Sequence, residues 1–480
     1  MRYNKVWKAT SIISNANLIP ERKVILMKFL TLEQHKSRIE NMRHAELGNR
    51  AYMRRHRIQE YLPAQAVYHL GDYPAPFSIE PTEYDYNMIK GMAENGVQLI
   101  QLHEDWNDHI RRYGADKYTS FDPKGLDNFI KLCHDFGIKV IPYISSGFLH
   151  EFDPDFREEF TIRKLYCRTG THFQYRVCSA GSELWREFIL PKTFQVLDRH
   201  DFDGIYNDYG TDSYFFYGGR YIKRDDVPGG GYDPELEDLL ATIYHEVKKR
   251  GGIYKLHINY NSPAPCIDKV YDYLWIGEGK STDDLGVGKN FPFYVIPCPD
   301  KALSAIKDPH HFFTVVIPFL QFPLLTSCGR PLRGRVIDED VPLYCNPGSE
   351  PGGGYIFQKK VHDYNAEHPD GPFVHSRWSA IPDDVRDYPT WVHYMSLYKP
   401  MVEENTIAYI GITDSVDIIS PIPENVNISM FVSHERYLVL GNLSGKDYEL
   451  VLSEKWTDRE TGVTSDRFTV KNDRLLFLKK

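Results

Sequence analysis

An acid at the end of an apolar strand is the first group in this sequence that could do chemistry. Residues 201–210 read DFDGIYNDYG, so that Ile205 and Tyr206 form the strand core and Asp208 precedes the break at Gly210. In a β/α barrel the carboxyl ends of the strands form the catalytic rim. A carboxylate there, beside aromatic and amide side chains, suits cleavage of a glycosidic bond. The alternative is that Asp208 only caps the following loop.

Glycosidic cleavage needs a second carboxylate on the other side of the bond. Glu278 is the candidate, because it lies between two glycines directly after the apolar run YLWI at 273–276. The glycines allow a sharp turn, and an aromatic setting would keep the acid protonated near neutral pH. The neighbours Tyr206 and Asn207 are expected to donate hydrogen bonds that keep Asp208 ionised. The alternative for Glu278 is a solvated turn acid.

The run HEDWND at 103–108 follows a second apolar stretch. We expect Asp105 to hold sugar hydroxyls and Trp106 to stack on a ring face. Two alternatives remain for this run. It could only cap and solvate a loop, or it could bind a metal ion through His103, Glu104, Asp108 and His109, with His257 and Asp208. No HxH or HExxH spacing supports the metal alternative, and no metal site is predicted.

Further polar residues follow other predicted strands or lie in a glycine-rich loop. His257, deeper in its strand, is predicted to be a core histidine, and Asp203 to face the opposite, stabilising end of the barrel. The candidates for binding substrate, in addition to Asp105 and Trp106, are Asp72, Asn207, Asn259, Asn261, Arg377 and Trp378. For Asp72 a turn role, and for the Arg377–Trp378 pair a structural salt bridge, are equally open.

The composition restricts the class of protein. A chain of 480 residues suggests two to three domains, and 33 Tyr with 7 Trp suit a cleft that stacks on sugar rings. The net charge of −9 and the lack of a long basic run argue against a nucleic-acid partner. Seven scattered cysteines favour reduced thiols, with Cys167–Cys178 as the one possible disulfide.

No apolar stretch approaches the ~18 residues of a membrane span, so no membrane partner is expected. The sequence as written shows no signal peptide and predicts a cytoplasmic protein. A periplasmic or secreted location would follow if the N-terminus is truncated.

The elements that must position these residues alternate between short apolar strands and amphipathic helices. Strands are predicted at 66–70, 97–102, 138–144, 203–208, 253–259, 270–276, 312–318 and 323–327, and helices at 83–95, 123–136, 182–200, 234–250 and 389–402. This alternation predicts an α/β fold with eight parallel strands, a (β/α)8 TIM-type barrel. After residue 405 short strands at 428–433, 437–441, 448–452 and 474–478 predict a C-terminal antiparallel β-sandwich.

Three segments follow from this pattern. Residues 1–60 form an N-terminal helical or linker segment, a possible remnant of a preceding domain. Residues 61–404 form the catalytic barrel, and residues 405–480 the β-sandwich.

The runs WREFIL at 185–190 and DGIYND at 203–208, in a barrel followed by a β-sandwich, resemble glycoside hydrolases. The resemblance covers residues 64–480 and is strongest to the α-galactosidase clan and related barrel α-glycosidases. It implies a nucleophilic Asp after strand four, Asp208, and an acid/base carboxylate after strand six, Glu278. Two features depart from the clan. Tyr206 and Asn207 precede Asp208 where many α-galactosidases have Lys-x-Asp, and the strand-six acid is Glu rather than Asp.

The sequence therefore predicts a retaining α-glycosidase that needs no cofactor, acts on an oligosaccharide, polysaccharide or other glycoside, and could self-associate. Carboxyl groups about 5–5.5 Å apart would support retention, and about 6.5–9.5 Å would support inversion. The rivals are a carbohydrate-binding barrel that has lost catalysis and a metal-dependent hydrolase.

Overall fold

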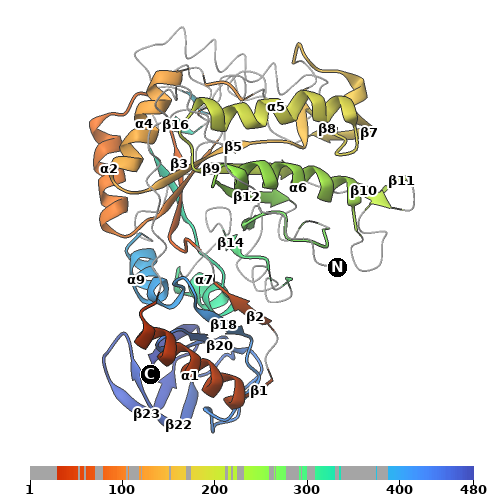
Figure 1. Cartoon of the computed structure of the whole chain (residues 1–480). Helices are drawn as coiled ribbons and strands as arrows, with labels where there is room; N and C mark the ends of the chain where they lie inside the picture. The colour runs from red at the N-terminus through yellow and green to blue at the C-terminus, as the bar shows by residue number, and fades with distance from the viewer. Residues whose placement is uncertain are drawn as a thin grey trace, which may run out of the picture.

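The chain folds into a β/α barrel and a C-terminal antiparallel sheet, with helices between them (Figure 1). The computed structural model describes residues 30–51, 54–58, 61–70, 79–103, 106, 118–120, 122–150, 153–168, 174–210, 214–217, 220–223, 232–258, 264, 266–276, 291–292, 294–299, 309–329, 335–336, 374–375 and 388–480. None of the helices among them is both long and apolar enough to cross a membrane.

The barrel consists of eight strands that pair in parallel, in the order β14-β13-β12-β9-β5-β4-β3-β15. Its edges are joined by backbone hydrogen bonds from Phe322 N to Pro297 O (2.8 Å) and from Leu324 N to Pro299 O (3.0 Å). The strands are β3 (Gln65–His69), β4 (Leu99–Leu102), β5 (Lys139–Ile144), β9 (Gly204–Gly210), β12 (Ile253–Ile258), β13 (Tyr273–Ile276), β14 (Pro297–Pro299) and β15 (Leu325–Gly329). The predicted parallel sheet and the position of Asp208 in its fourth strand are confirmed.

The helices begin at residues that the sequence marks as caps. The side chains of Asp122, Ser182 and Asp233 each accept a hydrogen bond from a backbone N–H in the first turn, and proline follows both aspartates. The helices beside the first strands are α2 (Glu83–Glu94), α4 (Pro123–Asp135), α5 (Glu183–Arg199) and α6 (Pro234–Lys249). All four lie within a few residues of their predicted ranges.

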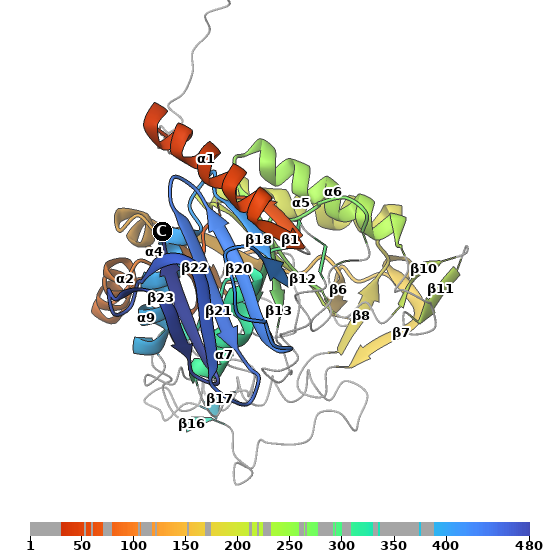
Figure 2. The ribbon, with the colours of Figure 1, turned by 90° about the horizontal axis from the view of Figure 1, so that it is seen from below.

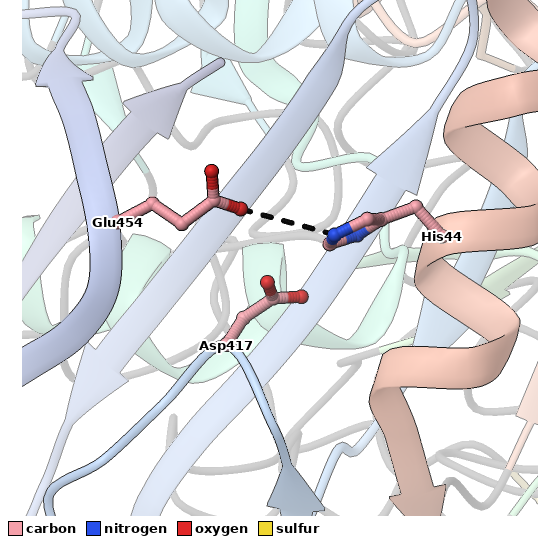
Figure 3. Close-up of side chains that lie close together, drawn as sticks. All are labelled: His44, Asp417 and Glu454. Carbon is pink, nitrogen blue, oxygen red and sulfur yellow. Dashed lines mark ion pairs between the residues drawn. The ribbon is translucent and has the colours of Figure 1, made fainter.

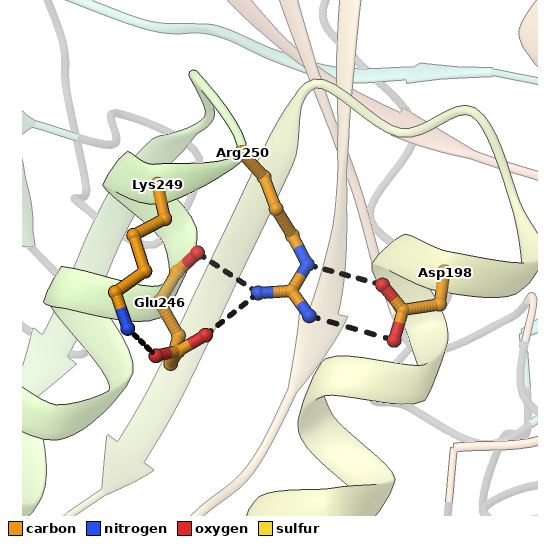
Figure 4. Close-up of polar contacts among 4 residues, drawn as sticks. All are labelled: Asp198, Glu246, Lys249 and Arg250. Atoms are coloured by element: carbon orange, nitrogen blue, oxygen red, sulfur yellow. Dashed lines mark hydrogen bonds and ion pairs between the residues drawn. The ribbon is translucent and has the colours of Figure 1, made fainter. Parts of the chain in front are cut away.

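Helices α5 and α6 are joined by one polar network (Figure 4). Arg250, which follows α6, donates to both carboxylate oxygens of Asp198 on α5, at 3.1 and 3.5 Å. It also donates to Glu246, whose second oxygen accepts from Lys249. The planar guanidinium therefore bridges the two helices behind β9 and β12.

One stretch predicted as a strand is a helix. Residues 312–318 lie in α7 (Pro309–Val316) and the 3-10 turn η6 (Ile317–Phe319), and the seventh strand is the short β14. Every residue from 312 to 318 is buried, and a fully buried run shows neither the period of a strand nor that of a helix. The prediction at this point was wrong.

Segments that leave the barrel form small two- and three-stranded sheets. The predicted hairpin near residue 170 is β7 (Thr161–Arg168) with β8 (Gln174–Cys178), which also pairs with β6 (Phe148–His150). Cys178 is a buried free thiol and lies opposite Thr161, so the Cys167–Cys178 disulfide is absent. The other pairs are β10 (Tyr214–Tyr217) with β11 (Arg220–Lys223) and, in parallel, β16 (Arg335–Val336) with β17 (Val374–His375).

The C-terminal part is a seven-stranded antiparallel sheet in the order β2-β18-β20-β21-β24-β22-β23. Its strands are β18 (Ile407–Ile410), β20 (Val426–Val432), β21 (Arg436–Asn442), β22 (Tyr448–Asp458), β23 (Thr464–Val470), β24 (Arg474–Lys479) and β2 (Arg54–Arg57). One face shares a core with the barrel through Phe431, Val439 and Phe477. Helices α7 and α9 (Tyr388–Tyr398) lie between the barrel and the sheet (Figure 1).

The N-terminal segment is part of this sheet. Helix α1 (Leu32–Gly48) lies across the face turned away from the barrel, where Ala45 joins the apolar core of the sheet (Figure 2). Strand β2 pairs with β18 along its whole length, and β1 (Asn49–Ala51) pairs with β19 (Asp414–Ser415). Within the predicted N-terminal segment, α1 is therefore helical, and β1 and β2 pair with strands of the C-terminal part.

Candidate active site

Asp208 lies near the carboxyl end of β9, between β5 and β12, and its side chain is 16% exposed. Both carboxylate oxygens are held by the neighbouring strands. His257 Nδ1 on β12 lies 3.0 Å from Oδ1, and the hydroxyl of Tyr143 on β5 donates to Oδ2 at 3.1 Å. Because an ionised carboxylate only accepts, Nδ1 must carry a proton in this contact. Asp208 is thus a partly accessible carboxylate of fixed orientation.

Aromatic rings surround the carboxylate on the interior side of the sheet. Trp275 lies in register with His257, and their rings meet edge to face with centroids 4.3 Å apart. The rings of Tyr206 and His103 lie 5.8 and 6.3 Å from Trp275. An aromatic wall beside a fixed carboxylate fits a polyhydroxylated ring, whose C–H faces stack on aromatic side chains.

The layer below Asp208 is polar although it is buried. Lys255, two residues before His257 on the same face of β12, donates to Gln65 Oε1 across the barrel at 3.0 Å. The amide of Gln65 in turn donates to Leu62 O at 2.8 Å. Gln101 belongs to the same interior face, because parallel register pairs it with Val67 and Ile141. The barrel centre is therefore hydrogen-bonding and not simply apolar.

Two residues predicted to bind substrate are placed elsewhere. Asn207 alternates with Asp208 and faces the helices, where it is fully buried. Its amide donates to Ser146 Oγ and to the hydroxyl of Tyr254, at 2.8 and 2.7 Å. Trp106 is also fully buried and donates from Nε1 to Tyr143 O at 2.9 Å. Neither side chain offers a surface to a sugar, and both brace the strands that carry the site.

The remaining predicted site residues lie outside the described residues. They are Glu278, Asp72, Asp105, Asn259, Asn261, Arg377 and Trp378. Glu278 follows β13, which ends at Ile276, and Asp72 and Asp105 follow β3 and β4, which end at His69 and Leu102. Asn259 and Asn261 follow β12, which ends at Ile258. All four strand ends lie at the rim that carries Asp208.

His257 and Tyr143 are the contacts that sequence reasoning missed. The sequence predicts a core role for His257 and places it near Asp208 only in the metal alternative, and it assigns no role to Tyr143. In the sheet register His257 on β12 pairs with Asp208, and Tyr143 on β5 pairs with Tyr206. Both side chains therefore lie on the interior face, on the two strands next to β9. The available signal was the alternation within each strand, but the alignment between strands cannot be read from one sequence.

Among the described residues, one group of three potential metal ligands lies close together, and it is remote from Asp208. His44 on α1, Asp417 and Glu454 meet on the C-terminal sheet (Figure 3). The guanidinium of Arg436 lies 3.7 Å from both carboxylates, and Lys480 pairs with Glu454. Two cations already balance the two acids, so this cluster is an ion-pair network between α1 and the sheet.

The fold can be compared with solved structures, whereas no family model and no curated protein sequence matches the chain. A trehalose-6-phosphate hydrolase from Bacillus licheniformis superposes with a TM-score of 0.51 at 13% identity, over 87% of this chain and 99% of the other. An α-amylase from Anoxybacillus gives 0.53 at 10% identity, over 88% and 98%. A maltogenic α-amylase from Thermotoga neapolitana gives 0.51 at 12% identity, over 87% and 97%.

These structures do not single out the α-galactosidase clan that the sequence resembles. A GH36 α-galactosidase from Geobacillus stearothermophilus gives a lower TM-score, 0.44. The likeness covers most of this chain and nearly all of the three amylase-type structures. The chain therefore shares the β/α-barrel fold of these α-amylase-type proteins.

Proposed function

We propose that this protein is a glycoside hydrolase that cleaves an α-glycosidic bond with retention, with Asp208 as nucleophile and Glu278 as acid/base. The observation that carries the proposal is the carboxylate of Asp208, held at both oxygens at the rim beside an aromatic wall. A nucleophile held in this way attacks without first losing orientational freedom.

The position of strand six supports the choice of partner. Strand β12 lies between β9 and β13, and neighbouring strands are about 4.8 Å apart, so the ends of β9 and β13 are about 10 Å apart. Side chains that reach inward from these two ends can flank one glycosidic bond. Glu278 follows β13 by two residues, and it is the first acid after that strand.

The reaction follows in two balanced steps. A carboxylate oxygen of Asp208 attacks the anomeric carbon while the bond to the leaving oxygen breaks, and Glu278 gives that oxygen its proton. Glu278 then takes a proton from water, whose oxygen attacks the same carbon and releases Asp208. His257 and Tyr143 would stabilise the carboxylate when it leaves. We assign sugar contacts to Asp72, Asp105, Asn259, Asn261, Arg377 and Trp378.

The test is hydrolysis of a panel of aryl α- and β-glycosides by the wild type, Asp208→Asn and Glu278→Gln. Asp201→Asn, which changes an exposed acid at the other end of β9, is the matched control. We expect one α-glycoside to be cleaved, Asp208→Asn to abolish cleavage, and the product to retain the anomeric configuration by NMR. Activity that survives Asp208→Asn would refute the mechanism. Sugar binding without cleavage would instead favour a carbohydrate-binding barrel.

A further inference from the structure

Two side chains in the barrel interior have hydrogen-bonding atoms without a partner. The indole Nε1 of Trp275 and both amide atoms of Gln101 are buried, and no described residue lies within hydrogen-bonding distance of them. A buried polar atom without a partner is costly, and folded proteins leave few of them. Such atoms need an explanation, and a ligand that is absent from the free protein is one.

Four comparable side chains among the described residues are paired. The indoles of Trp106, Trp185 and Trp391 each donate to a backbone carbonyl, at 2.9, 3.0 and 2.9 Å. Gln65, which is as buried as Gln101 and faces the same interior, uses both ends of its amide. Trp275 and Gln101 differ in this respect from these four side chains, although other buried polar atoms, such as Ser145 Oγ and Tyr398 Oη, also have no partner among the described residues.

Trp275 lies close to the candidate nucleophile, and Gln101 lies on the same interior face of the barrel. Trp275 is in register with His257, whose Nδ1 contacts Asp208. Gln101 lies on β4, two residues before His103, and the ring of His103 is 6.3 Å from that of Trp275. His103, two residues nearer the mouth of the barrel than Gln101, is half-buried, whereas Gln101 is fully buried.

The chemistry of the unpaired atoms limits what can satisfy them. The indole only donates, whereas the carboxamide both donates and accepts. A phosphate or an ionised carboxylate only accepts and would leave Gln101 Oε1 unpaired, and an ammonium group only donates and would leave both N–H groups unpaired. A hydroxyl group does both. Neighbouring hydroxyls on one ring could therefore satisfy Trp275 and Gln101 together.

We infer that Trp275 Nε1 and the Gln101 carboxamide form a subsite for hydroxyl groups inside the barrel mouth, which selects the sugar unit beside Asp208. This inference rests on the proposed function, because it assigns to the same site a neutral, polyhydroxylated glycone. The subsite binds the ring by hydrogen bonds from two opposed strands, β4 and β13, while Asp208 on β9 faces the anomeric carbon.

The experiment separates binding from catalysis. Each substitution is made in the Asp208→Asn background, and glucose, galactose and mannose are titrated by calorimetry while the Tm of the free protein is measured. Trp275→Phe keeps the ring and removes the N–H, and Gln101→Met keeps the shape and removes both polar atoms. Trp185→Phe and Gln65→Met are the matched controls, because their polar atoms are paired in the free protein.

The expected result has two parts. Trp275→Phe and Gln101→Met weaken binding of the preferred sugar about tenfold or more, yet change the Tm of the free protein by no more than about 1 °C, because no hydrogen bond is lost there. The controls lower the Tm and leave sugar affinity within about twofold wherever the protein stays folded.

Three results would overturn the inference. Unchanged affinity in both test variants would mean that water alone fills the subsite. A fall in Tm as large as in the controls would mean that the groups are paired within the free protein. Absence of binding by all three sugars would remove the subsite. Failure of the proposed function has a different signature, because sugars would still bind while no glycoside is hydrolysed by the unsubstituted protein.

Discussion

The acid at the start of β9 gives a prediction that does not depend on the proposed reaction. Asp203 accepts hydrogen bonds from His134 Nε2 at 2.8 Å and from the N–H of Val140 at 2.9 Å, and Lys139 Nζ lies 3.5 Å away. These contacts tie α4, β5 and β9 together at the end of the barrel opposite Asp208, as the sequence predicted for Asp203. We expect Asp203→Asn to destabilise the barrel in a pH-dependent way.

The sign follows from the two pKa shifts. The hydrogen bond with Asp203 raises the pKa of His134 despite its burial. Burial alone would raise the pKa of Asp203, but the hydrogen bonds from His134 and Val140 and the nearby cations outweigh it and lower that pKa. His134 makes its full contribution to folding stability below its pKa in the unfolded chain, about 6.5. Asp203 makes its full contribution above its own pKa in the unfolded chain, about 3.9. The pair therefore stabilises most between about pH 4 and 6.5, and less as the pH rises through the folded pKa of His134.

The size of the effect follows from the contacts. A hydrogen bond to a charged partner contributes about 1.5–3 kcal/mol, and partial exposure of both side chains reduces this. We expect Asp203→Asn to lower the free energy of unfolding by about 1–2 kcal/mol at pH 5.5, and by less at pH 8.5. Asp201 also lies near His134, at 3.5 Å from Nδ1, but its side chain is 73% exposed. Asp201→Asn should therefore cost about 0.5 kcal/mol or less.

The assay is urea unfolding of the wild type and both variants at pH 5.5 and 8.5, followed by tryptophan fluorescence. His134→Gln should flatten the difference between the two pH values. The reasoning would be refuted if Asp203→Asn lowers the free energy of unfolding by the same amount at both pH values, or by more at pH 8.5. It would also be refuted if Asp201→Asn lowers the free energy of unfolding as much as Asp203→Asn does.

Three further predictions follow from single contacts. His257→Phe keeps a ring against Trp275 but removes a hydrogen bond to Asp208. We expect kcat on the cleaved glycoside to fall about 10- to 150-fold with little change in KM, and an unchanged kcat would contradict the role assigned to His257. Gly204→Ala should prevent folding of the barrel by circular dichroism, because a Cβ there would lie 1.9 Å from Ile253 O and the backbone has a φ of +150°; a native spectrum would contradict this. Arg250→Met should lower stability by about 1 kcal/mol or less, since Asp198 is largely exposed, and a larger loss in urea unfolding would contradict it.

The order of strands and helices in the first two-thirds of the barrel could be predicted because capping residues and apolar runs are local signals. Strand β14 could not, since it has three residues, two of them proline. Helix α7 was mistaken for a strand because its neighbours bury it on all sides. The strand β2, with the sequence RRHR, has no apolar alternation to reveal it.

In the candidate site, too, local sequence signals reveal some residues, whereas others depend on the alignment of distant strands. Asp208 could be predicted because a strand end is visible in the sequence. Its partners His257 and Tyr143 could not, because they depend on the register of three strands that are distant in the chain. Asn207 was misplaced for a related reason. Adjacent residues in a strand point to opposite faces, so only one of Asn207 and Asp208 could face the interior.

The pairing of β2 with β18 constrains how the molecule is made. Arg57 pairs with Ile407, so one edge of the C-terminal sheet is synthesised before the barrel and must wait for its neighbour until the barrel has left the ribosome. Until then, the basic strand β2 and helix α1 have no partner, and the positive charges of β2 discourage pairing with other chains. Closing the sheet is a long-range step that should come late in folding. A fragment that starts after the barrel would lack this edge strand, and β2 and the C-terminal sheet are expected to unfold as one cooperative unit.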